Sequence, residues 1–158
     1  MGKIDKKNQM DKLDKKILRV LQEDARLSYT KIAKHVGSST ATVSDRVRKL
    51  QEYGIIKGYS VVLNASKIGV TTLIAIICVK PSFSVAEIGE TIAGLKETCC
   101  VHNITGDFDL IVSFKCFSST EREECVSIID RINRIDGIER VNTYMVLNTI
   151  KEESQIGL

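Results

Sequence analysis

The chain has 158 residues, 43% hydrophobic and 27% charged, a composition that fits one large or two small globular domains. No apolar run approaches the ~20 residues that a membrane span needs, and the start MGKIDKKNQM lacks the apolar core of a signal peptide. We therefore expect no membrane partner and no secretion, and we expect the protein in the cytoplasm.

The net charge of +3 conceals a division along the chain. Residues 1–60 carry 14 Lys and Arg against 7 Asp and Glu, a net charge of +7, whereas residues 61–158 carry 9 against 13, a net charge of −4. A basic first part and an acidic second part predict two domains with different partners, and a polyanion is the natural partner of the first.

Two amphipathic helices are predicted at the start of the basic part. Asp11, with Asp14 three residues later, forms an imperfect capping box for the first, and Ser28 and Gly37 can begin and end the second. Their apolar positions recur at helical spacing: Leu13, Ile17, Val20 and Leu21 in the first helix, and Ile32, Ala33 and Val36 in the second.

A third helix is predicted between Ser39 as N-cap and Gly54, with the apolar stripe Val43, Val47 and Leu50. Its opposite face carries small, hydroxyl and charged side chains, as a recognition helix in the DNA major groove requires. Two short helices, a turn with a glycine and such a third helix predict a helix-turn-helix. The residues expected to face DNA are Ser39, Thr40, Ala41, Thr42, Ser44, Asp45, Arg48 and Lys49.

Alternatives to DNA contact remain for this face. An ordinary helical bundle would also carry a solvated polar face, and Asp45 suits an ion pair with Arg48 or Lys49 on the same helix. Arg46 lies closer to the apolar stripe and is a candidate to brace the fold. The next residues, 55–64, are rich in β-branched and aromatic side chains and predict a strand, followed by a turn at 65–69.

The acidic part reads as two β-α-β units. Four strands are expected at 71–80, 99–105, 108–117 and 138–150, with helices at 84–95 and 120–134, the second capped by Ser118 and Glu121. A Gly106-Asp107 turn joins the two halves, which gives the ferredoxin-like order with both helices on one face of an antiparallel sheet. The other face would expose Ile74, Ile76, Ile111 and Val146 unless a second subunit covers it, so a two-fold homodimer is expected.

Five cysteines lie mostly in apolar segments: Cys78, Cys99, Cys100, Cys116 and Cys125. None belongs to a C-x-x-C pair, and the chain has only two histidines, so no zinc site or other cofactor is expected. We interpret the cysteines as small buried hydrophobic residues in a reducing compartment, with a redox role as the alternative.

Three segments, LDKKILRVLQEDARLSYTKIAKHVG, DRVRKLQEYGIIKGY and GDFDLIVSF, together resemble the leucine-responsive regulatory protein/AsnC family, the feast/famine regulators. The resemblance extends from about residue 10 to residue 150. It implies a winged-type helix-turn-helix at 10–54, a β linker at 55–69, a ferredoxin-like effector-binding and oligomerisation domain at 70–150, and a tail at 151–158. It also implies double-stranded DNA as partner, dimers that assemble into octamers or other higher forms, and an amino-acid effector. The chain departs from some relatives at Thr40 and Thr42, where they have prolines, and at Lys31, where an acid is common.

The family resemblance places the effector at the GDFD turn, between dimers. Asp107 and Asp109 could accept hydrogen bonds from an ammonium, and backbone N–H groups of the turn or the start of the following helix could donate to a carboxylate. The expected effector residues are Thr105, Gly106, Asp107, Phe108, Asp109, Ser118, Ser119 and Thr120. The alternatives are a plain hairpin turn with a solvated Asp109, and a weak cation site at the two carboxylates.

Two other functions remain open beside an effector-responsive transcription regulator. Some decarboxylases of haem biosynthesis resemble the same two-domain fold, but the only histidines are His35 and His102, and no nucleophile-base pair is visible. We therefore do not expect an enzyme. An architectural DNA-binding protein without an effector is the third reading.

Overall fold

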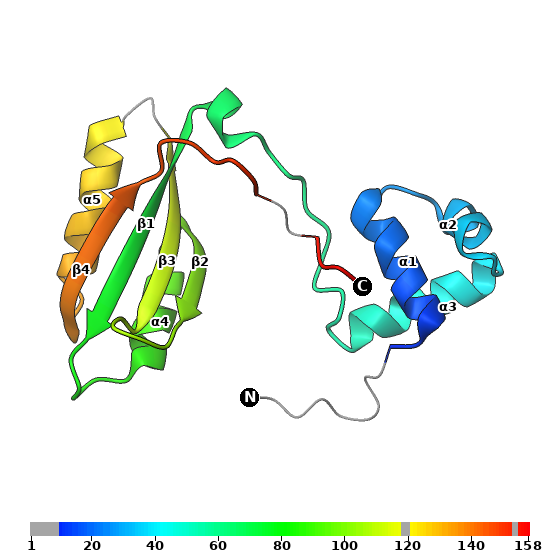
Figure 1. Cartoon of the computed structure of the whole chain (residues 1–158), viewed down its shortest axis with the longest axis horizontal. Helices are drawn as coiled ribbons and strands as arrows, with labels where there is room; N and C mark the ends of the chain where they lie inside the picture. The colour runs from blue at the N-terminus through cyan, green and yellow to red at the C-terminus, as the bar shows by residue number, and fades with distance from the viewer. Residues whose placement is uncertain (1–9, 118–120, 153–154) are drawn as a thin grey trace. The chain divides into compact units, whose positions relative to one another are not determined.

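The structure is a computed structural model that describes residues 10–117, 121–152 and 155–158; for Ser66 and residues 121–125 only the backbone is described. The chain forms two compact units (Figure 1). The first extends to Val62 and includes Glu152–Leu158, and the second is Leu63–Lys151. None of the described helices is both long and apolar enough to cross a membrane.

The first unit contains the three expected helices, α1 (Lys12–Glu23), α2 (Tyr29–Val36) and α3 (Thr40–Glu52). The predicted caps are confirmed: Asp11 and Asp14 form the capping box of α1, Ser28 caps α2, and Ser39 caps α3. Gly37 ends α2 in the left-handed conformation that glycine adopts without strain, with φ 69°. The helices enclose a small core of Ile17, Leu21, Ile32, Ala33, Val36, Val43 and Val47.

The strand expected at residues 55–64 is absent, so this prediction was wrong for the single chain. A strand is stable only when its backbone N–H and C=O groups pair with a neighbour, and none of the described segments lies beside this one in a sheet. Its apolar side chains are therefore left in solvent, with Val61 and Val62 77% and 83% exposed. A short 3-10 helix, η2 (Ala65–Ile68), takes the place of the expected turn.

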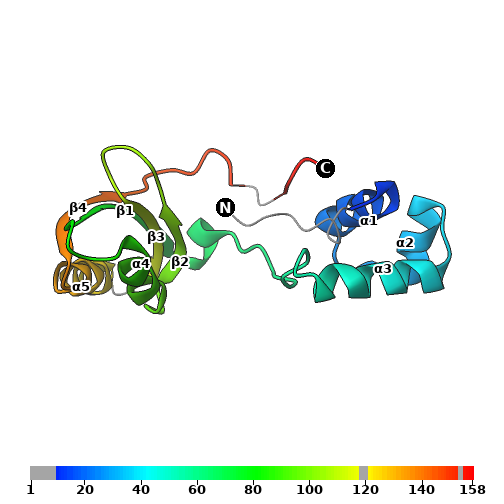
Figure 2. The same ribbon diagram turned by 90° about the horizontal axis from the view of Figure 1, so that it is seen from below.

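The second unit is a four-stranded antiparallel sheet with two helices, which confirms the ferredoxin-like arrangement. The strands are β1 (Val70–Val79), β2 (Thr98–Asn103), β3 (Leu110–Phe117) and β4 (Ile138–Met145), in the spatial order β2-β3-β1-β4. Helices α4 (Val85–Ala93) and α5 (Glu121–Asn133) both cover the same face of the sheet, as Figure 2 shows.

Alternation along the strands decides which residues form the core. On β1, Leu73, Ala75, Ile77 and Val79 are buried beneath the helices. Ile74 and Ile76 point to the opposite face, the open face, together with Ile111 of β3. These open-face residues are only half-buried in the single chain.

The connection between β2 and β3 is longer than the expected two-residue turn. It comprises residues 104–109, because β2 ends at Asn103 and β3 begins only at Leu110. The Ile104 N–H donates to the Asp109 C=O at 2.9 Å and closes the loop. Phe108 and Asp109 therefore belong to the loop. Figure 2 shows this loop projecting from the sheet on the side away from α4 and α5.

Candidate DNA-binding surface and effector site

The start of α3 presents the small polar surface that was expected. Thr40, Ala41 and Ser44 are exposed, and no large apolar side chain lies among them. Thr42 differs, because it is half-buried and its hydroxyl lies 2.8 Å from the Ser39 hydroxyl, while its backbone N–H donates to the same Ser39 oxygen. Ser39 and Thr42 thus close the first turn of the helix as well as flank the exposed face.

Arg48 is held within its own helix rather than extended into solvent. Its guanidinium pairs with Asp45 at 2.8 Å and with Glu52 at 2.9 Å, and all three side chains are exposed. The Arg48 hydrogen bond lowers the pKa of Asp45, and the hydrogen bond to Asp45, followed by that to Glu52, raises the pKa of Arg48. The expected Asp45–Arg48 ion pair is confirmed, and the positive charge of Arg48 is locally balanced.

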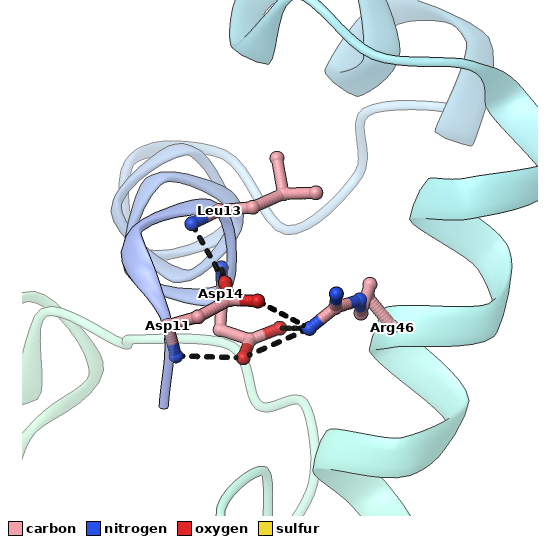
Figure 3. Close-up of polar contacts among 4 residues, drawn as sticks. All are labelled: Asp11, Leu13, Asp14 and Arg46. Carbon is pink, nitrogen blue, oxygen red and sulfur yellow. Dashed lines mark hydrogen bonds and ion pairs between the residues drawn. The ribbon is translucent and has the colours of Figure 1, made fainter. Parts of the chain in front are cut away.

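Arg46 of α3 pairs with the two acids of the α1 capping box, as Figure 3 shows. Its Nη1 atom lies 2.6 Å from Asp11 Oδ2 and 3.3 Å from both carboxylate oxygens of Asp14. Asp14 is buried and also accepts the Asp11 backbone N–H, so one guanidinium joins the capping box of α1 to the candidate recognition helix. The expected bracing role of Arg46 is confirmed, although the sequence did not indicate its partners.

The loop at 104–109 places its two acids differently. Asp109 Oδ2 accepts the Val79 backbone N–H at 2.7 Å, and the Asp109 N–H donates to Ile77 C=O at 2.9 Å. Asp109 therefore anchors the loop to the end of β1, where the pairing of β1 with β4 is irregular. The alternative of a solvated Asp109 was wrong. Asp107, by contrast, is exposed, with Thr105 and Gly106 beside it.

Two residues that the sequence did not assign to the effector site lie against this loop. Cys78 of β1 and Arg140 of β4 are register partners, and Arg140 Nη2 lies 3.5 Å from the Cys78 sulfur. The Cys78 thiol also lies 3.5 Å from the Asp107 carbonyl oxygen, and the Arg140 guanidinium carbon lies 5.2 Å from the centre of the Phe108 ring. No local pattern could reveal this grouping, because β1, the loop and β4 meet only through strand pairing.

Ser118, Ser119 and Thr120, expected to donate to an effector carboxylate, lie outside the described residues, as does the capping box that would include Ser118. Among the residues that the structure describes, no group of three or more His, Cys, Asp or Glu side chains could hold a metal ion.

The cysteines are less buried than expected. Of the described cysteines Cys116 alone is fully buried, so burial of most cysteines was a wrong expectation. On β2, the Cys100 sulfur lies 2.8 Å from His102 Nε2.

Comparison with known proteins agrees with this division into two functional units. The AsnC-type helix-turn-helix domain matches residues 10–51, and the Lrp/AsnC ligand binding domain matches residues 73–156. The chain is 38% identical to an uncharacterized HTH-type transcriptional regulator of Pyrococcus furiosus, over 94% of this chain and 98% of that protein.

Solved structures give the same result. The chain resembles AsnC of E. coli with 26% identity and a TM-score of 0.78, over 93% of this chain and 98% of the other. A transcriptional regulator from Neisseria meningitidis, solved in complex with L-Met, shares the fold with 21% identity and a TM-score of 0.81, over 94% and 97% of the two chains. The helix-turn-helix, the ferredoxin-like unit and these matches agree: the chain belongs to the Lrp/AsnC family and is a transcription regulator with a DNA-binding and a ligand-binding domain.

Proposed function

We propose that this regulator reads operator DNA with the exposed start of α3. The observation that carries the proposal is the small polar face of that helix, held in direction by the Arg46 bridge to Asp11 and Asp14. Small and hydroxyl side chains permit close approach to base edges, while Lys49 supplies charge for phosphate. The proposed contacts are Ser39, Thr40, Ala41, Thr42, Ser44, Asp45, Arg48 and Lys49.

A double variant tests the DNA surface. Replacing both Arg48 and Lys49 by alanine removes the two cations of the α3 face, and we expect electrophoretic mobility shifts to show at least a tenfold loss of operator affinity. The matched control replaces Lys67 and Lys96, two exposed cations of the second compact unit. Equal loss in both double variants would mean that net charge alone matters, and unchanged affinity in the first would remove α3 from the interface.

The second part of the proposal concerns the ligand. An amino-acid effector binds at the 104–109 loop, with the exposed Asp107 carboxylate accepting from its ammonium and Asp109 anchoring the loop. The regulator that was solved with L-Met has the same fold, which supports an amino acid as the ligand class. The proposed effector site comprises Thr105, Gly106, Asp107, Phe108, Asp109, Ser118, Ser119 and Thr120.

Screening the twenty standard amino acids by thermal shift tests the ligand class, because a ligand that binds only the folded state raises the unfolding temperature. Each amino acid that raises it is then titrated into the parent and Asp107→Asn by calorimetry. The variant keeps a side chain of the same size but lacks the charge, so weaker binding is expected. If none of the twenty raises the unfolding temperature while DNA binding persists, the architectural reading replaces this one.

The third part concerns assembly. We infer that a second copy of the chain covers the open face of the sheet, where Ile74, Ile76, Ile111 and Val146 are half-buried, and that such homodimers assemble further, up to an octamer. Exposed Tyr144 of β4, the register partner of Ile74, extends this apolar area. A ligand bound between dimers would change DNA affinity through assembly, since whatever the assembled state binds more tightly also favours that state.

A further inference from the structure

Arg140 occupies a preformed position at the open face of the ligand-binding domain. It lies on β4 opposite Cys78 of β1, and its Nη2 donates toward the Cys78 sulfur at 3.5 Å. The Phe108 ring lies 5.2 Å from the guanidinium carbon, within the range of a cation–π contact. The Cys78 thiol in turn reaches the Asp107 carbonyl oxygen at 3.5 Å, so strand and loop together hold the guanidinium.

The charges at this place are not paired with each other. Of the described residues, neither Asp107 nor Arg140 takes part in an ion pair. The Cys78 hydrogen bond is the main cause that raises the pKa of Arg140, and the carboxylates of Glu139 and then Asp107 add to it. The Phe108 ring beside the guanidinium and the Cys78 contact to the Asp107 carbonyl oxygen place the loop residue Asp107 near Arg140, with no ion pair between the two side chains.

The geometry of the guanidinium decides which ligand group it suits. A guanidinium is planar, and its N–H donors lie at its edge in a fork that matches the two oxygens of a carboxylate. The Phe108 ring makes a cation–π contact with the guanidinium, and Cys78 accepts from one nitrogen only. Most of the five N–H donors of Arg140 are therefore unused. An α-amino acid zwitterion, which carries its ammonium and its carboxylate on the same carbon atom, would satisfy Asp107 and Arg140 at the same time.

We propose that Arg140 binds the carboxylate of the amino-acid effector while Asp107 binds its ammonium. This inference rests on the proposed effector site at Asp107 and adds the residue that selects for a free carboxylate. The donor is thus a side chain of β4, rather than the start of the helix after β3. The site then discriminates an amino acid from the corresponding amide or amine, and Cys78 and Phe108 are positioning residues that hold the guanidinium.

Calorimetry with paired probes tests this inference. Each standard amino acid that binds the parent protein is paired with its own α-carboxamide. The carboxamide keeps the ammonium and the side chain but lacks the carboxylate. The parent should prefer the free acid roughly 10- to 100-fold, the magnitude typical of a hydrogen-bonded charge. Arg140→Gln should lose most of that preference, because the variant should bind the free acid more weakly and the carboxamide as before. The preference of Arg140→Lys should lie between those of the parent and Arg140→Gln, because lysine keeps the charge but not the forked N–H donors.

Matched variants separate the possible failures. Arg134→Gln removes an exposed arginine just beyond α5 and should bind both probes as the parent does. If no amino acid binds the parent, the proposed effector function fails, and this inference fails with it. If Asp107→Asn weakens binding while Arg140→Gln keeps the full preference for the acid, the effector site stands and the role of Arg140 is overturned. Arg140→Gln that changes only the sedimentation of the protein would instead assign the residue to contact between copies, which also overturns the proposal.

Discussion

Arg46 Nη1 lies 2.6 Å from Asp11 Oδ2, which ties the middle of α3, the proposed recognition helix, to the first residue of the capping box of α1. The two residues are 35 positions apart in the sequence. Because Asp11 caps α1 and Arg46 also reaches Asp14, one side chain controls both the start of one helix and the direction of another. The stability of the DNA-binding domain and the position of its proposed DNA-contacting face therefore depend on the same contact.

Arg46→Ala should lower the free energy of unfolding of the DNA-binding domain by about 1–2 kcal/mol, a value reduced for the partial exposure of the pair. The buried Asp14 carboxylate would lose its cationic partner, which is the main physical reason for the loss. Urea unfolding followed by circular dichroism measures the change. Lys49→Ala removes an exposed cation from the same helix and should leave stability nearly unchanged; an equal effect of both variants would contradict a specific role for Arg46.

The stability that Asp11 provides should depend on pH. The Asp14 backbone N–H, then the Arg46 guanidinium and the Leu13 N–H, hold the pKa of Asp11 below its ordinary value, against an opposing effect of burial. Since the folded pKa is the lower one, the stabilisation is complete above the unfolded pKa and is lost as pH falls through the folded pKa. The difference in unfolding temperature between the parent and Asp11→Asn should thus be largest near neutral pH and narrow below about pH 4. In the Arg46→Ala background, the difference at neutral pH should be smaller.

Asp45→Asn should strengthen DNA binding. The Asp45 carboxylate now pairs with Arg48 at 2.8 Å, and its removal leaves the guanidinium held by Glu52 alone and takes a negative charge off the α3 face. We expect a several-fold gain in affinity and a steeper dependence of log affinity on log salt, by about one unit for one added phosphate contact. Fluorescence anisotropy over a salt series measures both, and Glu87→Gln on α4 serves as the control for net charge. A weaker complex would contradict this prediction and would show that the Asp45 carboxylate itself accepts a hydrogen bond from a base, rather than facing DNA only as the partner of Arg48.

Gly137→Ala should destabilise the ligand-binding domain strongly. Gly137 has φ 94°, and a Cβ there would lie 2.5 Å from ring atoms of Phe83. Backbone strain and crowding together cost about 2–4 kcal/mol. Gly94→Ala is the matched control in the same unit, because Gly94 has φ −72° and its nearest contact would be an ordinary 3.4 Å. Thermal unfolding of both variants measures the loss of stability. Combined with Gly137→Ala, Phe83→Ala should relieve only the part of that loss that crowding causes, and the backbone strain should remain.

Neighbouring isoleucines on β1 should give opposite phenotypes. Ile76 faces the open side of the sheet, whereas Ile77 is fully buried beneath the helices. Ile76→Glu should leave the circular dichroism spectrum unchanged but prevent self-association in analytical ultracentrifugation, since a charge cannot be buried between two sheets without a partner. Ile77→Ala should cost about 2–5 kcal/mol of stability. A parent protein that sediments as a monomer would refute the proposed dimer.

The sequence by itself determined the helices, the four strands of the sheet and the core residues of the DNA-binding domain. Helical and strand periodicities are local, so Ile17, Val43 and Val47 could be assigned to one core, and the caps at Asp11, Ser28 and Ser39 followed from hydrogen bonds within three residues. Fold class followed from the order of these elements, because few topologies accommodate two β-α-β units.

Only the tertiary structure decided which distant side chains meet. Strand pairing brings Cys78 and Arg140 to the loop of Asp107, and helix packing gives Arg46 its two carboxylates. The wrong strand at 55–64 has the same origin, because residue preference is local but a strand requires a partner, and the chain does not supply one among its described residues. Periodicity fixes the face on which a side chain lies, whereas strand register and helix packing, which depend on long-range contacts, fix its neighbours.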